Sequence, residues 1–260
     1  MKVEDVMTEE IISVDKDENL RYVLKLMEKH NITKIPVVND KKFVGIVTDN
    51  TIAYKLGSIR SKGVPASRLH ASSVLEKDVP TVTRGTNVNE ILKTVGEPGP
   101  TMINVVENDQ LFGIVTKADL LPYVEDDQKV ENIMKKDVKT VHADDRVIHA
   151  RRQMIDEEIA RMPVTHHGRL VGMVSDMDIA FAFAELKRST SLGRQKNKLD
   201  KLLVEEAMKK PVIWTKPDMK ISEAAKLMLE EDVGGLPILK DDKLVGIVTR
   251  TDLIKTISSL

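Results

Sequence analysis

The sequence predicts an α/β (α+β) fold built from four repeats, each with the order strand–helix–strand–strand–helix. Three observations support this prediction. A short apolar run that contains Gly and ends in a hydroxyl residue occurs at residues 45–48, 113–116, 172–175 and 246–249. A hairpin pattern contains each run, and a helical spacing of apolar residues precedes each hairpin. The uneven spacing of the copies excludes a regular solenoid and favours two larger units of two repeats each.

The composition excludes several classes of protein. The chain has 260 residues, 41% hydrophobic and 31% charged, with a net charge of -1, so neither nucleic acid nor an anionic membrane is an expected partner. Because Cys is absent, disulfides, thiolate nucleophiles and Cys-based metal sites are excluded. We find no signal peptide and no apolar run of membrane-spanning length, and we expect a cytoplasmic protein.

Repeat 1, residues 1–57, shows the plan most simply. A strand at residues 11–14 precedes a helix, and the polar turn at residues 39–42 joins strands 34–38 and 43–47 as a hairpin. The helix has apolar residues at helical spacing, namely Leu20, Val23, Leu24 and Met27. The second helix is expected to begin at Thr48.

Repeat 2, residues 69–124, follows a linker at residues 58–68 and departs from the plan in one place. Its first helix must stop at residues 96–100, where two glycines and two prolines occur. The strand that follows has Asn104 at the position where the other repeats have Pro.

Repeats 3 and 4, at residues 129–186 and 204–258, restore the plan. Residues 187–203 between them are polar and basic, and we interpret them as a linker. A single repeat buries little apolar surface, so each repeat should pair with a copy of itself.

The ordered set of motifs resembles the cystathionine beta-synthase (CBS) domain. The set consists of a hydrophobic-Met opening at Met7, Met134 and Met208, a hydrophobic-Pro-hydrophobic strand, and a Gly-x-x-Thr/Ser-x-x-Asp ending. The resemblance implies two tandem (Bateman) modules, formed by repeats 1 and 2 and by repeats 3 and 4. It also implies a regulatory protein that binds AMP, ADP, ATP, S-adenosylmethionine or methylthioadenosine in clefts between paired repeats. Four-copy chains of this kind resemble the nucleotide-sensing gamma subunit of AMP-activated kinase and its stand-alone microbial relatives.

The Thr/Ser-x-x-Asp ending allows two interpretations. Asp119, Asp178 and Asp252 are three residues past the hydroxyl, where an acid can close a capping box worth about 1 kcal/mol. Alternatively, the same carboxylates can accept hydrogen bonds from ribose hydroxyls beside a helix N-terminus that suits phosphate. Since a capping box prefers Glu or Gln at this position, the three aspartates favour the ligand interpretation.

The family resemblance also assigns the walls of the clefts. It pairs the acid end of one repeat with the Pro strand of its partner, whose backbone contacts the base and whose basic residues, Lys34 and Arg161, reach phosphate. Three clefts are expected to be usable: Thr116 and Asp119 with Thr33, Lys34 and Ile35; Ser175 and Asp178 with Gly234, Gly235 and Leu236; and Thr249 and Asp252 with Ala160, Arg161 and Met162. The fourth cleft, which would pair Thr48 and Thr51 with residues 100–104, has neither the Asp nor the Pro, and we expect it to be empty or weak.

Two other functions stay open at this point. The repeats may serve only as a ligand-free scaffold, and the same modules would allow a homodimer or an unidentified regulated protein as partner. An enzyme is the least favoured class, because the chain has neither Cys nor a Gly-rich phosphate loop followed by Lys. We assign no catalytic residue, no metal site and no required cofactor.

Overall fold

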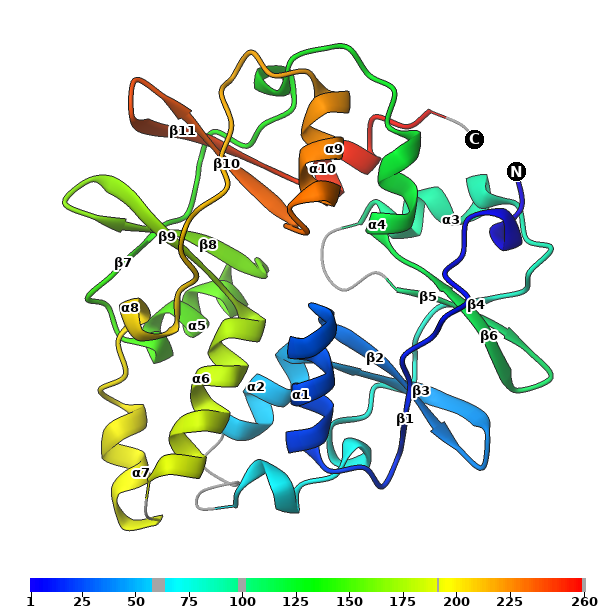
Figure 1. The fold of residues 1–260 in the computed structure, drawn as a ribbon, viewed down its shortest axis with the longest axis horizontal. Helices are drawn as coiled ribbons and strands as arrows, with labels where there is room; N and C mark the ends of the chain where they lie inside the picture. The colour runs from blue at the N-terminus through cyan, green and yellow to red at the C-terminus, as the bar shows by residue number, and fades with distance from the viewer. Residues whose placement is uncertain (58–63, 98–101, 191, 259–260) are drawn as a thin grey trace.

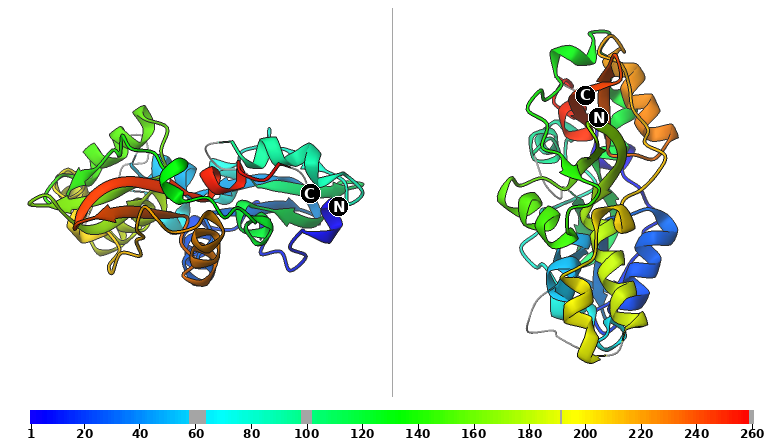
Figure 2. Two further views of the ribbon diagram at one scale, coloured as in Figure 1. Left: turned by 90° about the horizontal axis from the view of Figure 1, so that it is seen from above. Right: turned by 90° about the vertical axis from the view of Figure 1, so that its left-hand side faces the viewer.

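The four repeats form a flat ring in the structure, a computed structural model that describes residues 1–57, 64–97, 102–190 and 192–258. Around the ring, repeat 1 adjoins repeats 2 and 3, and repeat 4 closes the ring between them (Figure 1). The side views show that the ring is thin (Figure 2). The predictions made for residues 58–63 and 98–101 lie outside the described residues.

Repeat 1 contains a three-stranded sheet in which β1 lies parallel to β2 and β2 lies antiparallel to β3. Helix α1 begins at the cap Asn19, whose side chain accepts a hydrogen bond from the Tyr22 amide, and it ends before Asn31 in the left-handed conformation. The first strand is shorter than the sequence predicted. The elements are η1 (Val3–Asp5), β1 (Val14–Asp15), α1 (Leu20–His30), β2 (Lys34–Asn39), β3 (Lys42–Thr48) and α2 (Asp49–Gly57).

Repeats 2 and 3 reproduce this sheet with the same strand order and directions. Repeat 2 consists of η3 (Ala66–Arg68), η4 (Ala71–Val74), β4 (Thr81–Val82), α3 (Val88–Val95), β5 (Ile103–Glu107), β6 (Gln110–Val115), α4 (Lys117–Leu120) and η5 (Leu121–Tyr123). Repeat 3 consists of η6 (Val130–Asn132), β7 (Val141–His142), α5 (Val147–Asp156), β8 (Arg161–His166), β9 (Arg169–Ser175) and α6 (Asp176–Ser189).

Repeat 4 has the hairpin and both helices, and a single parallel bridge between Thr215 and Ile238 takes the place of its first strand. Its elements are α8 (Val204–Ala207), α9 (Ile221–Glu230), β10 (Gly235–Lys240), β11 (Lys243–Thr249) and α10 (Arg250–Ile254).

The opening segment of each repeat pairs with its partner repeat, as the two predicted modules require. Isolated antiparallel bridges join Thr8 to Ile114 and Glu76 to Ile46 in the first module, and Lys135 to Ile247 and Lys209 to Met173 in the second. The methionine before three of these bridges packs on the glycine of the partner's hairpin. A Cβ on Gly113, Gly172 or Gly246 would lie 2.4–2.5 Å from the sulfur of Met7, Met208 or Met134, respectively, so each glycine is needed for close approach. These methionines therefore have a packing role.

Two hydrophobic cores hold the modules together, and each core is shared by repeats of different modules. The first contains Ile52 of repeat 1 and Phe183 of repeat 3, and the second contains Leu120 of repeat 2 and Leu253 of repeat 4. Helix α2 packs along α6, and α4 packs against α10. Because these helix faces are buried within one chain, a homodimer would have to use another surface.

The predicted linker at residues 187–203 is wrong in part, because most of it is helical. Helix α6 continues to Ser189, and α7 (Leu192–Leu199) follows. Gln195 Nε2 donates to the carbonyl oxygens of Lys187 (3.0 Å) and Thr190 (2.9 Å), which fixes α7 against the end of α6. Polar composition indicated a linker, whereas these buried hydrogen bonds order the segment.

Among the described residues, no helix is long and apolar enough to cross a membrane.

Candidate functional site

The three predicted aspartates close capping boxes at the N-termini of α4, α6 and α10. In each case the Oδ2 atom accepts two hydrogen bonds from the preceding hydroxyl residue. Asp119 accepts from the Thr116 amide (2.6 Å) and hydroxyl (2.7 Å), and Asp252 accepts from the Thr249 amide (2.8 Å) and hydroxyl (2.7 Å). Asp178 accepts from the Ser175 amide at 2.8 Å and hydroxyl at 2.5 Å. The capping interpretation is confirmed, and our argument that Asp disfavours it was wrong.

The second carboxylate oxygen, Oδ1, distinguishes the three aspartates. Asp119 Oδ1 accepts from the Thr8 hydroxyl at 2.7 Å, so both of its oxygens are engaged within the chain. Asp178 Oδ1 lies 3.6 Å from the ammonium of Lys209, which is largely exposed and free to move. Asp252 is nearly buried, and in the described part of the chain its Oδ1 has no hydrogen bond or ion pair. Asp252 is thus the most available acceptor, Asp178 is next, and Asp119 is the least available.

The predicted Pro-strand residues lie beside the helix start of their own repeat. Lys34, Arg161 and Gly235 pair in register with Thr48, Ser175 and Thr249. The carbonyl one residue earlier, at Thr33, Ala160 or Gly234, accepts a hydrogen bond from the first amide of the helix at 2.9, 3.1 or 3.3 Å. The side chains of Ile35, Met162 and Leu236 are fully buried in the cores, so only their backbone is available to a ligand.

Arg161 joins its own repeat to the partner repeat across the second module. A Cβ on Gly234 would lie 2.3 Å from Arg161 Nη1, and a Cβ on Gly235 would lie 3.3 Å from Arg161 Cδ. The two glycines therefore make room for the arginine. As a result, the structure brings together Ser175 and Asp178, Arg161, and the Gly234–Gly235 wall that the sequence predicted for their cleft.

Each repeat contributes one cation to a shared cluster: Lys34, Lys117, Arg161 and Arg250. Burial is the main cause that lowers the pKa of Lys34; Asp49 opposes this shift, and Arg161 and Arg250 add to it. Burial also lowers the pKa of Arg161, and Arg250 lowers it further. The pKa of Lys117 falls to about 8, first through burial and then through Lys34 and Arg161. These mutual effects show that the four positive charges are close enough to repel one another.

Two acids lie in the same region, at the first residues of α2 and α6. Burial raises the pKa of Asp49, against the opposing effect of Lys34. The pKa of Asp176 rises to about 6 through burial and then through Asp49, although Arg151 Nη1 donates to its carboxylate at 2.9 Å. Arg151 also donates to the Asn50 side chain at 3.0 Å, which ties repeat 3 to repeat 1.

Arg161 is the cation of the cluster that lacks a partner. Arg250 donates to the carbonyls of Val233 (3.1 Å) and Met228 (3.3 Å) and to Asp232 (3.2 Å), and Lys34 lies 3.4 Å from the Thr33 hydroxyl. Within the described residues, the Arg161 guanidinium has no hydrogen bond or ion pair, and its side chain is only partly exposed. An incompletely solvated guanidinium without an acceptor is costly, and a bound anion would offset that cost.

The fourth cleft contains a carboxylate that sequence reasoning missed. Thr48 and Thr51 cap α2, and the Thr48 hydroxyl donates to Glu76 Oε1 at 3.1 Å across the module. Asn104 occupies the Pro position and is fully buried. Sequence reasoning also missed the charged residues directly after each hydroxyl, which are Asp49, Lys117, Asp176 and Arg250. Their regular position was a usable signal, whereas the Glu76 contact depends on pairing between repeats.

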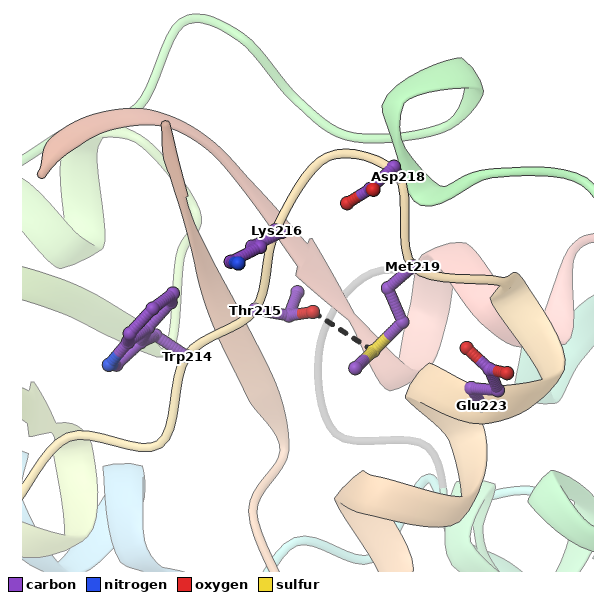
Figure 3. A pocket seen from close by; sticks show the side chains of 6 residues that line it. All are labelled: Trp214, Thr215, Lys216, Asp218, Met219 and Glu223. Carbon is purple, nitrogen blue, oxygen red and sulfur yellow. Dashed lines mark hydrogen bonds between the residues drawn. The ribbon is translucent and has the colours of Figure 1, made fainter. Parts of the chain in front are cut away.

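A surface hollow of about 390 Å³ lies apart from this cluster, at the start of α9 (Figure 3). It is lined by Trp214, Thr215, Lys216, Asp218, Met219 and Glu223. The Trp214 ring points away from Met219 and Glu223, so the side chains do not converge on a common point. We place the candidate site at the charged cluster because its groups do converge. Among the described residues, no group of His, Asp and Glu is arranged to hold a metal ion.

Comparison with known proteins agrees with the motifs and the fold. The profile of the CBS domain matches residues 3–58, 71–126, 130–185 and 204–259. The uncharacterized protein MJ1404 of Methanocaldococcus jannaschii is 29% identical over 274 residues, which cover 99% of this chain but only 62% of MJ1404. MJ1225 of the same organism, also uncharacterized, is 26% identical over 273 residues that cover 94% of each protein. The crystal structure of MJ1225, described as a proposed archaeal homolog of g-AMPK, has a TM-score of 0.84 at 24% identity and covers 98% of this chain and 99% of that chain.

Proposed function

Because the chain belongs to the CBS-domain family, we propose that it is a regulatory protein that binds an adenosine-containing ligand beside Asp178 and Asp252. The single observation that carries this proposal is the partnerless Arg161 guanidinium, which lies against Gly234 and within reach of the charges of Lys34, Lys117 and Arg250. A phosphate placed there would accept charge-assisted hydrogen bonds from Arg161 and relieve the repulsion among the cations. The carboxylates of Asp178 and Asp252 would receive the ribose hydroxyls.

The charge of the cluster favours a phosphorylated nucleoside over an S-adenosyl compound. AMP, ADP and ATP carry negative phosphates, whereas S-adenosylmethionine carries a positive sulfonium and methylthioadenosine is neutral at the corresponding position. A sulfonium would add a fifth positive charge to the four of the cluster. The expected order of affinity is therefore AMP, ADP and ATP ahead of methylthioadenosine, with S-adenosylmethionine last.

The regulatory response would arise from the contact between repeats 1 and 4. Asp232 accepts from Arg250 at 3.2 Å, and its Oδ2 accepts from Asn31 Nδ2 at 2.6 Å. A phosphate at Arg250 would compete with Asp232 and so weaken the hold of Asp232 on Asn31. Binding can shift the arrangement of the modules in this way because the ligand interacts differently with the two states.

A thermal-shift screen of ligand-free protein tests this function. AMP, ADP, ATP, methylthioadenosine and S-adenosylmethionine are compared, and a ligand at 1,000 times its Kd should add about 4 kcal/mol of stability. Arg161→Met should abolish the shift. The matched control is Arg188→Met, which removes an exposed arginine paired with Glu185 on α6 and should leave the shift unchanged.

A ligand-free scaffold is the second candidate, favoured by the engagement of all three aspartates in helix capping. A scaffold would show no shift with any of the five compounds. It would also lose stability when Asp252 is replaced, without any effect on binding.

A further inference from the structure

We infer that the fourth cleft is a binding site for a nucleoside ligand, with Glu76 of repeat 2 supplying the carboxylate that the helix of repeat 1 lacks. The inference rests on the proposed function, since it assigns a further site to the same class of ligand. It reverses the expectation that this cleft is empty or weak.

The first observation is the equivalence of four residues in the opening segments. Thr8, Glu76, Lys135 and Lys209 each form a bridge to the partner's hairpin, two residues before its hydroxyl. The bridges of Thr8 and Glu76 are close copies, because the amide of Thr8 donates to the Ile114 carbonyl and the amide of Glu76 donates to the Ile46 carbonyl, both at 2.9 Å. The opening residue of one repeat thus always lies beside the helix turn of its partner.

The second observation is an exchange of chemistry between the two sides of the fourth cleft. In the Asp119 cleft the helix carries the acid and the opening segment carries the hydroxyl of Thr8. In the fourth cleft the helix carries the hydroxyl of Thr51, and the opening segment carries the acid Glu76. A hydroxyl and a carboxylate are therefore present in both clefts, with their positions reversed.

Glu76 is also less engaged than the aspartates. The Thr48 and Thr51 hydroxyls cap α2 by themselves: the Thr51 amide donates to Thr48 Oγ1 at 3.1 Å, and the Thr48 amide donates to Thr51 Oγ1 at 3.1 Å. In the described structure Glu76 accepts one side-chain hydrogen bond, from Thr48, whereas the Asp119 carboxylate accepts three. A carboxylate has about four acceptor positions, so Glu76 retains capacity for both hydroxyls of a ribose.

The third observation is a buried acceptor on the wall opposite Thr48 and Glu76. Asn104 is 0% exposed, and among the described residues its Oδ1 atom has no hydrogen-bond donor. Its neighbours Ile103 and Val105 belong to the second core, so strand alternation puts Asn104 on the other face of the sheet, toward the sheet of repeat 1. Its Nδ2 donates to the carbonyl of Pro80, in the same segment as Glu76, which fixes the amide orientation.

The three groups match the parts of a nucleoside. Vicinal hydroxyls would donate to Glu76, and an exocyclic amino group would donate to the free Asn104 Oδ1. Lys34, in register with Thr48, is the nearest cation for a phosphate. The ligand class is therefore an amino-bearing nucleoside, with or without a phosphate.

Calorimetric titration of the ligand-free full chain with AMP tests the inference through stoichiometry. Glu76→Gln keeps an acceptor for the Thr48 hydroxyl and removes the charge, and it should eliminate one site or weaken it at least tenfold. Thr51→Asp in the Glu76→Gln background puts a carboxylate where the other three repeats have one and should restore the site. The control Glu90→Gln, on α3, should match the wild type.

The outcomes separate the two proposals. If Glu76→Gln binds as many AMP molecules as the wild type with the same affinities, the inference is overturned and the proposed function stands. If the wild type binds no AMP, both fail together. Should Glu76→Gln not fold, Asn104→Leu, which replaces a half-satisfied amide by a side chain of similar shape, must lose the same site for the inference to survive.

Discussion

Replacing Gly234 by Ala tests the placement of Arg161 without touching the arginine itself. The added Cβ would lie 2.3 Å from Arg161 Nη1 and 2.6 Å from Cζ and Nη2, so the guanidinium must move. The backbone conformation at Gly234 is not left-handed, and the methyl group therefore adds no backbone strain. Only the end of a flexible side chain has to give way, which costs about 1 kcal/mol of folding stability.

The effect on AMP binding should be much larger than the effect on stability. Hydrogen bonds between a charged group and a phosphate contribute about 1.5–3 kcal/mol, so Gly234→Ala should weaken binding roughly 10- to 100-fold. Calorimetric titration gives the affinity, and denaturant unfolding of the ligand-free protein gives the stability. Gly85→Ala is the control, because a Cβ there would meet no atom within 4 Å.

A double-mutant cycle decides whether Arg161 is the cause. In an Arg161→Ala background there is no guanidinium to displace, so Gly234→Ala should weaken binding no further. The reasoning is refuted if Gly234→Ala binds AMP like the wild type, or if it weakens binding equally with and without Arg161.

Three further predictions concern charged groups of the site. Asp252→Asn should cost about 1 kcal/mol of stability and weaken AMP binding at least tenfold, whereas Thr249→Ala should cost similar stability with little loss of binding; equal losses of binding would mean that Asp252 acts only as a cap. The pKa of Asp176 is about 6 in the folded chain against an ordinary value of 3.8, so the folded state binds the extra proton and stability should fall as pH rises through this window. Denaturant unfolding at several pH values should show Asp176→Asn without up to about 3 kcal/mol of that fall, and a parallel fall in both proteins would contradict the assignment. Because the pKa of Lys117 is about 8, AMP binding near that pH should take up roughly half a proton, measured as a buffer-dependent binding enthalpy that Lys117→Met removes; uptake that persists in the variant would exclude Lys117 as its source.

The sequence was sufficient for the features that depend on local residues. The hairpins and the helix starts follow from turn and capping residues within a few positions, and Asp119, Asp178 and Asp252 lie at the predicted helix N-termini. The helices α1 and α9 follow from their apolar stripes. Pairing of repeats 1 and 2 and of 3 and 4 was implied by the family resemblance and is seen in the bridges between opening segments and hairpins.

The features that depend on distant pairing could not be predicted. An apolar stripe does not specify its partner, so nothing in the sequence indicated that repeats 1 and 3 share one core and repeats 2 and 4 the other. Glu76 lies in the segment before β4, and only the fold brings it to Thr48. Asp closes the capping boxes although it is shorter than Glu, because the hydroxyl residue before each helix is extended and presents both its amide and its side chain.

The most direct test of the central claim is a crystal structure of the chain grown with AMP. We expect the phosphate to accept hydrogen bonds from the Arg161 guanidinium and the ribose hydroxyls to contact Asp178 or Asp252. AMP found only at the hollow beside Trp214, or an Arg161 that contacts no ligand atom in an AMP-bound chain, would contradict the account.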